Sequence, residues 1–127
     1  MYESEVVKNL VARENLVAQK EFHLDGVGFV DILTKDQIIE VKEVSSWKHA
    51  LGQVLAYSAA LGGNREKRIH LFSRSGEIID KNDVEVAKRI CQRFGVTATW
   101  EGADYVRRAH AMDRRLASLD RFRFGAR

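Results

Sequence analysis

The sequence has no proline and only one cysteine, and these two absences limit what the chain can be. The lack of proline argues against proline-rich linkers and tails. Cys91 has no second cysteine for an internal disulfide, and no Cys/His cluster has the spacing of a zinc site. We therefore expect a protein that works in a reducing, intracellular compartment.

Long apolar runs are also missing. No stretch of 18 apolar residues occurs, so we expect no transmembrane helix and no membrane partner. The first ten residues lack the basic-then-apolar layout of a signal peptide. With 127 residues and 45% apolar content, residues 1–127 are predicted to be one domain with an ordinary core. The expected location is the cytoplasm or, for a viral protein, the nucleic-acid compartment of the host cell.

Hydrophobic periodicity predicts an α/β chain. Apolar positions spaced for one helix face alternate with short runs that have the period of strands. The predicted order is a helix at 3–13, strands at 16–24, 28–33 and 38–42, a helix from Ser45 or Ser46 to Leu61, strands at 66–73 and 78–80, a helix from Asn82 or Asp83 with Phe94 in its apolar stripe, a strand at 96–100 and a last helix at 103–120.

The second and third predicted strands carry charges among apolar residues. Asp31 lies in the first of them, and Glu40 and Lys42 lie in the second. Strand residues two positions apart point the same way, so Glu40 and Lys42 share one face. Buried charges need compensation, and a divalent cation with a phosphate would supply it. Without the cation, we expect one carboxylate to have a raised pKa.

These residues are the basis of a family resemblance. Asp31, followed after eight residues by Glu40-Val41-Lys42, resembles the motif of the PD-(D/E)XK nuclease superfamily, although Val30 replaces the usual proline. The resemblance covers residues 3–73. It implies a restriction-endonuclease-like αβββαβ core with a mixed central sheet, to which residues 75–127 would add a helix, a strand and a basic C-terminal helix.

Further residues match particular branches of that superfamily. Gln53 and Tyr57, four residues apart on one helix face, resemble the Q-x-x-x-Y motif of the RecB-type exonucleases. Holliday-junction resolvases place a glutamate on the first helix beside the metal, which would here be Glu5, with Glu3 as the second choice. The pattern also resembles the small virus-type replication-repair nucleases. An ordinary polar helix face and a favourable helix dipole are the structural alternatives.

Two regions are candidates for contact with a DNA backbone. The start of the helix at 45–61 offers Ser45, Ser46 and Lys48 to a phosphate. The C-terminal region is the second, because residues 105–127 hold seven arginines and two aspartates. Its arginines recur at seven-residue intervals and include Arg107, Arg108, Arg114 and Arg115. This line of arginines is typical of a polyanion-binding face, but a solvated helix surface would show the same pattern.

The resemblance implies a metal-dependent DNA endonuclease that hydrolyses phosphodiester bonds, either structure-specific or of the homing or restriction type. Mg²⁺, for which Mn²⁺ could substitute, would be held by Asp31 and Glu40, with Glu5 nearby. Lys42 would orient or deprotonate the water and Gln53 would fix the geometry. The alternatives are a nucleic-acid-binding module that no longer cuts and a merely charged strand pair.

The last expectation concerns assembly. One domain of this size supplies one active site, whereas cutting both strands of a duplex or a junction needs two, so we expect a homodimer or higher homo-oligomer on DNA. The candidate contact is a narrow apolar line on the last predicted helix, formed by Val106, Ala109, Met112, Leu116 and Leu119.

Overall fold

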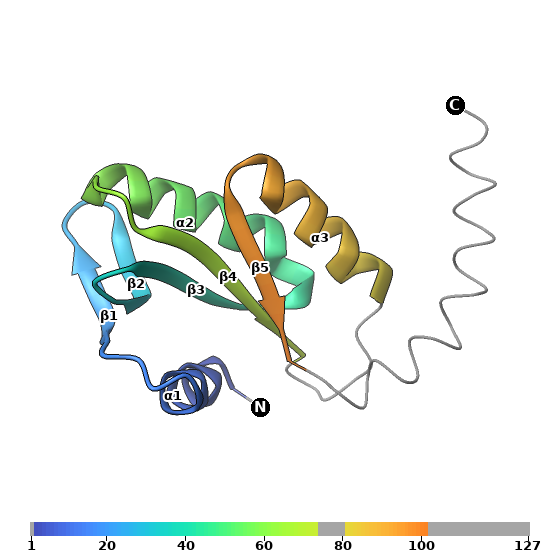
Figure 1. Cartoon of the computed structure of the whole chain (residues 1–127), viewed down its shortest axis with the longest axis horizontal. Helices are drawn as coiled ribbons and strands as arrows, with labels where there is room; N and C mark the ends of the chain where they lie inside the picture. Colours follow the sequence, from blue (N-terminus) through green and yellow to red (C-terminus); the bar gives the residue numbers. More distant parts are fainter. Residues whose placement is uncertain (1, 74–80, 102–127) are drawn as a thin grey trace.

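The computed structural model describes residues 2–73 and 81–101, which form a five-stranded sheet with helices on both faces (Figure 1). Within these two ranges, no helix combines the length and the apolar character needed to cross a bilayer. The elements are α1 (Glu3–Arg13), β1 (Gln19–Leu24), β2 (Gly28–Leu33), β3 (Gln37–Glu43), the 3-10 turn η1 (Val44–Ser46), α2 (Trp47–Leu61), β4 (Glu66–Phe72), α3 (Lys81–Arg93) and β5 (Val96–Trp100).

The predicted α/β class and the order of helix, three strands, helix and strand are confirmed. Some boundaries were wrong. The first strand begins at Gln19 rather than at residue 16, and α3 begins at Lys81, so Asn82 and Asp83 lie inside its first turn. Phe94 follows α3 and is 54% exposed, outside the predicted apolar stripe. The strand predicted at 78–80 and the helix predicted at 103–120 lie outside the described residues.

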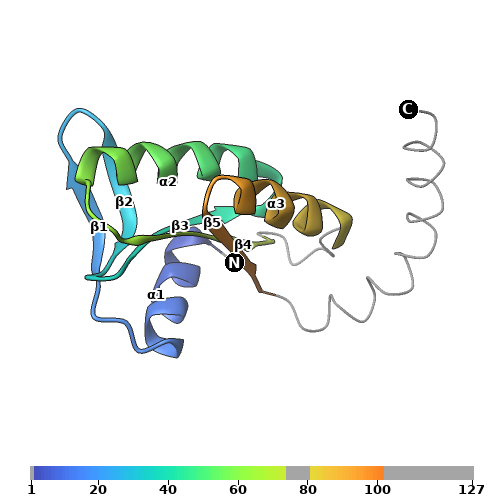
Figure 2. The same cartoon turned by 45° about the horizontal axis from the view of Figure 1, so that its top comes forward.

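The sheet is mixed, and its strands lie in sequence order from β1 to β5. β1, β2 and β3 are antiparallel neighbours, whereas β3, β4 and β5 run parallel. Parallel neighbours need a crossover, which α2 provides between β3 and β4. Figure 2 shows α2 and α3 on one face of the sheet and α1 on the other. This arrangement sandwiches β3 and β4, which explains why both are largely buried.

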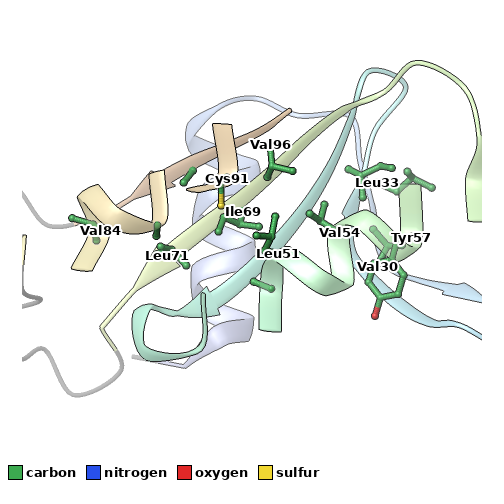
Figure 3. Packing of buried hydrophobic residues seen from close by; sticks show 14 residues of the cluster. Val30, Leu33, Leu51, Val54, Tyr57, Ile69, Leu71, Val84, Cys91 and Val96 are labelled. Atoms are coloured by element: carbon green, nitrogen blue, oxygen red, sulfur yellow. The ribbon is translucent and has the colours of Figure 1, made fainter. Parts of the chain in front are cut away.

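Each face of the sheet has its own apolar cluster. The larger one, which we call the α2 cluster, packs α2 and α3 on the sheet. Figure 3 shows its side chains, including Leu51, Val54, Ile69 and Leu71. The smaller one lies under α1 and consists of Val6, Val7, Leu10, Ile32, Ile39, Val41 and Phe72. In both clusters, apolar side chains of a helix and of the sheet are removed from water when they pack together. This burial is the main driving force for the packing.

Strands β1 and β2 reverse their side-chain alternation at one level. Val30 and Ile32 are two residues apart yet belong to opposite clusters. In β1, Phe22 packs against the α2 cluster, whereas Lys20 lines a cavity on the α1 side. The residue between them in β1 is Glu21, which has a left-handed φ of 52°. The residue opposite it on β2 is Asp31, but these two residues do not pair in the ladder, which passes from Lys20 with Ile32 to Phe22 with Val30.

A buried polar network fastens the end of α1 to β4 and β5. Arg68 on β4 is 8% exposed, and its two terminal nitrogens each donate to the Glu14 carboxylate at 2.7 Å. The bond from Arg68 holds the pKa of Glu14 below its usual value. Buried His70 contacts the Thr99 hydroxyl at 2.7 Å and Glu101 at 3.1 Å. Such paired geometry compensates the charges that burial would otherwise penalise.

The backbone of Glu21 provides a test of this local distortion. A left-handed conformation costs an L-residue roughly 1–2 kcal/mol, whereas glycine in a strand costs roughly 0.5–1 kcal/mol. Glu21→Gly should therefore be as stable as the wild type or up to about 1 kcal/mol more stable in urea unfolding. Glu21→Val should be clearly less stable, because a β-branched side chain fits this conformation worst. A valine variant more stable than the glycine variant would contradict the assignment.

Candidate functional site

Two carboxylates hold β2 and β3 together where their backbone ladder stops. The paired residues end at Ile32 with Ile39. One residue further, the backbone N–H of Asp31 donates to Glu40 Oε1 at 3.1 Å, and the N–H of Val41 donates to Asp31 Oδ2 at 2.8 Å. Side chains have thus replaced carbonyl groups as acceptors, and each acid bonds the strand that carries the other.

Burial gives these acids unusual protonation behaviour. Glu40 is 1% exposed. Desolvation, followed by the negative charge of Asp31, raises the pKa of Glu40 to about 8. The pKa of Asp31 is also raised, by desolvation and then by the charge of Glu3. Half-buried Lys42 acts in the opposite direction on both carboxyl groups, and it forms no ion pair with a described residue. The pair therefore lacks full charge compensation within the described protein.

Helix α2 supplies an amide and a phenol to the same region. Gln53 Nε2 donates to the Tyr57 hydroxyl at 3.4 Å, and Gln53 Oε1 is buried without a partner among the described residues. Tyr57 lies beside Val30 with its hydroxyl pointing away from the apolar cluster (Figure 3). Burial and then the charge of Glu40 raise its pKa. The charges of Glu40 and Asp31 thus act on Tyr57, which is buried rather than merely packed at the edge of the helix.

Gly28 makes this approach of Tyr57 possible. A Cβ atom at position 28 would lie 2.8 Å from the tyrosine hydroxyl oxygen, closer than such atoms approach one another. The backbone at Gly28 also has a φ of 147°, which side chains rarely adopt. Glycine at the start of β2 therefore lets the phenol pack directly against the backbone of β2.

A cavity of about 500 Å³ opens beside Asp31 on the α1 side of the sheet. It is lined by α1, β1 and β2 through Glu3, Ser4, Val7, Lys8, Lys20, Glu21 and Asp31. The glutamate that α1 contributes is Glu3, whereas Glu5 is exposed and does not line the cavity. The reason is helical spacing, because Glu3 lies three and four residues before the buried Val6 and Val7.

The predicted backbone contacts at the start of α2 are all on the surface. Ser45 and Ser46 belong to η1 and are exposed, and Ser46 occupies the N-cap position of α2 without a side-chain capping bond. Lys48 is exposed, with its Nζ 5.9 Å from the centre of the Trp47 ring. Trp47 itself packs partly against the α2 cluster. Arg107, Arg108, Arg114 and Arg115 lie outside the described residues.

Lys8, Lys20, Glu21 and the polar network of Arg68 were not identified from the sequence. Helical spacing could have indicated Lys8, which lies four and five residues after Ser4 and Glu3. No strand pattern could have indicated Lys20, because simple alternation places it with Phe22 on the α2 side. Its position follows only from the reversal at Glu21.

The donor set can be tested against the divalent cation that the resemblance implies. Within residues 2–73 and 81–101, no group of three or more His, Cys, Asp or Glu side chains is placed to hold a metal. Mg²⁺, however, commonly takes one or two carboxylates and keeps several waters. The undercompensated pair of Asp31 and Glu40 meets that requirement. The residues present therefore fit such an ion.

Comparison with known proteins finds relatives in one virus. No family model and no solved structure matches the chain. Three proteins of Acanthamoeba polyphaga mimivirus, each named as a KilA-N domain-containing protein, are similar to it. L32 is 49% identical over 70 residues, which are 55% of this chain and 18% of that protein. L33 is 35% identical over 69 residues, 54% of this chain and 26% of that protein. R878 is 32% identical over 69 residues, with coverage of 54% and 18%.

The matched part is a minor share of each relative. The chain matches between 18% and 26% of the length of these curated proteins. It is therefore similar to one segment of larger viral proteins, and their names refer to the whole of each.

The raised pKa of Glu40 makes stability depend on pH. Its pKa of about 8 in the folded state exceeds the unfolded value of about 4.3. The folded state then binds more protons between these values, so stability falls as pH rises. Without metal, the free energy of unfolding should drop by roughly 2 kcal/mol between about pH 6.5 and 8.5. The lowered pKa of His70 affects mainly the range below this window.

The matched variant for this measurement is Glu40→Gln, which keeps an oxygen to accept the Asp31 N–H. It should show a much flatter pH dependence in urea unfolding and a higher stability than the wild type near pH 8.5. Equal slopes for the two proteins would mean that Glu40 ionises normally.

Proposed function

We propose that this domain is a metal-dependent DNA endonuclease with a restriction-endonuclease-like core. The observation that carries the proposal is the interlocked pair of Asp31 and Glu40 at the opening between β2 and β3. The buried Glu40 and the half-buried Asp31 both have raised pKa values, Lys42 lies on the same strand as Glu40, and the Gln53 amide oxygen has no partner among the described residues. Such a constellation is typical of a functional site.

The topology supports this proposal. The described chain runs helix, three strands, helix, strand, with antiparallel β1–β3 followed by parallel β3–β4. This is the order that the PD-(D/E)XK resemblance implies. Asp31 and Glu40 occupy neighbouring strands of that order, so the motif residues lie together.

The acids would hold Mg²⁺ or Mn²⁺ between them. When bound, the ion would supply Lewis-acid chemistry, making a water more acidic and offsetting charge on the phosphate. The protein itself would fix the carboxylates, because each is bonded to a backbone N–H of the opposite strand. Such rigid placement lowers the reorganisation that the site must undergo on reaction.

Lys42 and Gln53 would position the attacking water. Lys42 is half-buried and without a described ion-pair partner, so its ammonium group is available to orient the water or to meet negative charge. The buried Oε1 of Gln53 accepts no hydrogen bond from residues 2–73 or 81–101, and a water proton would satisfy it. Tyr57 would hold the amide in place through its contact with Nε2.

A binding module that no longer cuts is the second candidate. It is favoured by the absence of a third acidic ligand within reach of the pair in the described chain. In that case the carboxylates would serve only to close the strand opening. The two candidates differ in one measurable property, which is hydrolysis of DNA in the presence of a divalent cation.

The test is cleavage of labelled duplex, flap and four-way-junction DNA with Mg²⁺ or Mn²⁺. Wild-type protein should cut at least one of these substrates and should stop in EDTA. Asp31→Asn and Glu40→Gln should abolish cutting while keeping the backbone hydrogen bonds. Lys42→Met should slow it by about 10²-fold or more. Lys67→Met, on β4, removes the same charge and should leave the rate unchanged.

Stability measurements separate loss of chemistry from loss of fold. Asp31→Asn removes one of two neighbouring carboxylates that are at least partly withdrawn from water, so the metal-free variant should be at least as stable as the wild type. Failure of the wild type to cut any of the three DNA forms with either ion would leave the binding module as the better explanation. Full activity in Glu40→Gln would refute the assigned site.

A further inference from the structure

We propose that the cavity beside Asp31 is the seat of a DNA phosphate, bound by Lys8 and Lys20 after a divalent cation has bound the carboxylate pair. This inference rests on the proposed function, because it names how the same site would hold its substrate. The two lysines come from separate elements, α1 and β1, and line one cavity with Asp31.

The lysines are available for such a contact. Both side chains are exposed, and neither forms a hydrogen bond or an ion pair with a described residue. By contrast, the guanidinium group of the buried Arg68 donates hydrogen bonds to the Glu14 carboxylate. A cavity wall with two unengaged ammonium groups offers flexible point charges, which suit phosphate oxygens.

The backbone directs Lys20 into this cavity at a cost. Ordinary alternation would place Lys20 on the same side as Phe22, against the α2 cluster. The left-handed φ of Glu21 reverses the alternation, and Lys20 then faces α1. Strained residues inside a strand persist where the surrounding structure requires them, and they concentrate at functional sites.

The balance of charge in the cavity implies an order of binding. Its carboxylates are Glu3, Glu21 and Asp31, and they outnumber the two lysines. A phosphate entering this cavity alone meets a net negative wall. A divalent cation on Asp31 reverses the sign, so phosphate binding through the lysines depends on the cation.

The experiment measures DNA binding rather than cutting. Fluorescence anisotropy of a labelled duplex and a four-way junction is recorded in Ca²⁺ and in EDTA over a range of salt concentrations. The proteins are wild type, Lys8→Gln, Lys20→Gln and the double variant. Lys35→Gln is the matched control, because this exposed lysine lines a different cavity with Arg65. Far-ultraviolet circular dichroism confirms that each variant is folded.

The expected result in Ca²⁺ is a several-fold weaker binding for each cavity variant and no change for Lys35→Gln. The slope of log affinity against log salt should fall by about 0.9 for each lysine removed. In EDTA, the cavity variants and the wild type should bind alike. Cavity variants that match Lys35→Gln in Ca²⁺ would overturn the inference while leaving the nuclease proposal to its own assay.

Other outcomes separate the two proposals. Lysine-dependent binding in Ca²⁺ without cleavage in Mg²⁺ or Mn²⁺ would support the phosphate seat and refute the nuclease. An equal lysine effect in Ca²⁺ and EDTA would refute the dependence on the cation. Absence of DNA binding by the wild type under both conditions would overturn both proposals.

Discussion

The opening between β2 and β3 is the constraint on which the described site depends. A regular ladder would satisfy the backbone N–H groups of Asp31 and Val41 with carbonyl oxygens, but here two carboxylates take that place. An unsatisfied buried N–H costs about as much as a lost hydrogen bond. The two carboxylates therefore join β2 to β3, and the same hydrogen bonds hold the carboxylates in position.

Placing two acids at this opening is energetically costly. Removing the two acids from water penalises their charged forms, and their proximity adds repulsion. Stabilising interactions elsewhere in the fold offset this unfavourable free energy. Apolar clusters cover β3 on both faces, and the network of Arg68 and Glu14 holds α1 against β4. The site thus lies beside a strand that apolar side chains cover on both faces.

The sequence predicted most elements of this fold because their apolar spacing is regular. Helix α1 and the pair β4 and β5 follow it closely, and the acids of β2 and β3 stand out among apolar neighbours. The structure departs from these expectations where tertiary contacts override local rules. The preference for Glu5 over Glu3 rested on adjacency to the apolar stripe along the chain, whereas it is Glu3 that lines the cavity. Lys20 and Glu21 were missed because strand alternation fails where the backbone turns left-handed.

The distortion at Glu21 has another consequence, at the rim of the sheet. Within the described sheet β1 is an edge strand, and a flat edge with free N–H and C=O groups would pair readily with a strand from another chain. A left-handed residue flanked by the charged Lys20 breaks the regular row of donors and acceptors along this edge. Growth of the sheet across β1 is thereby opposed.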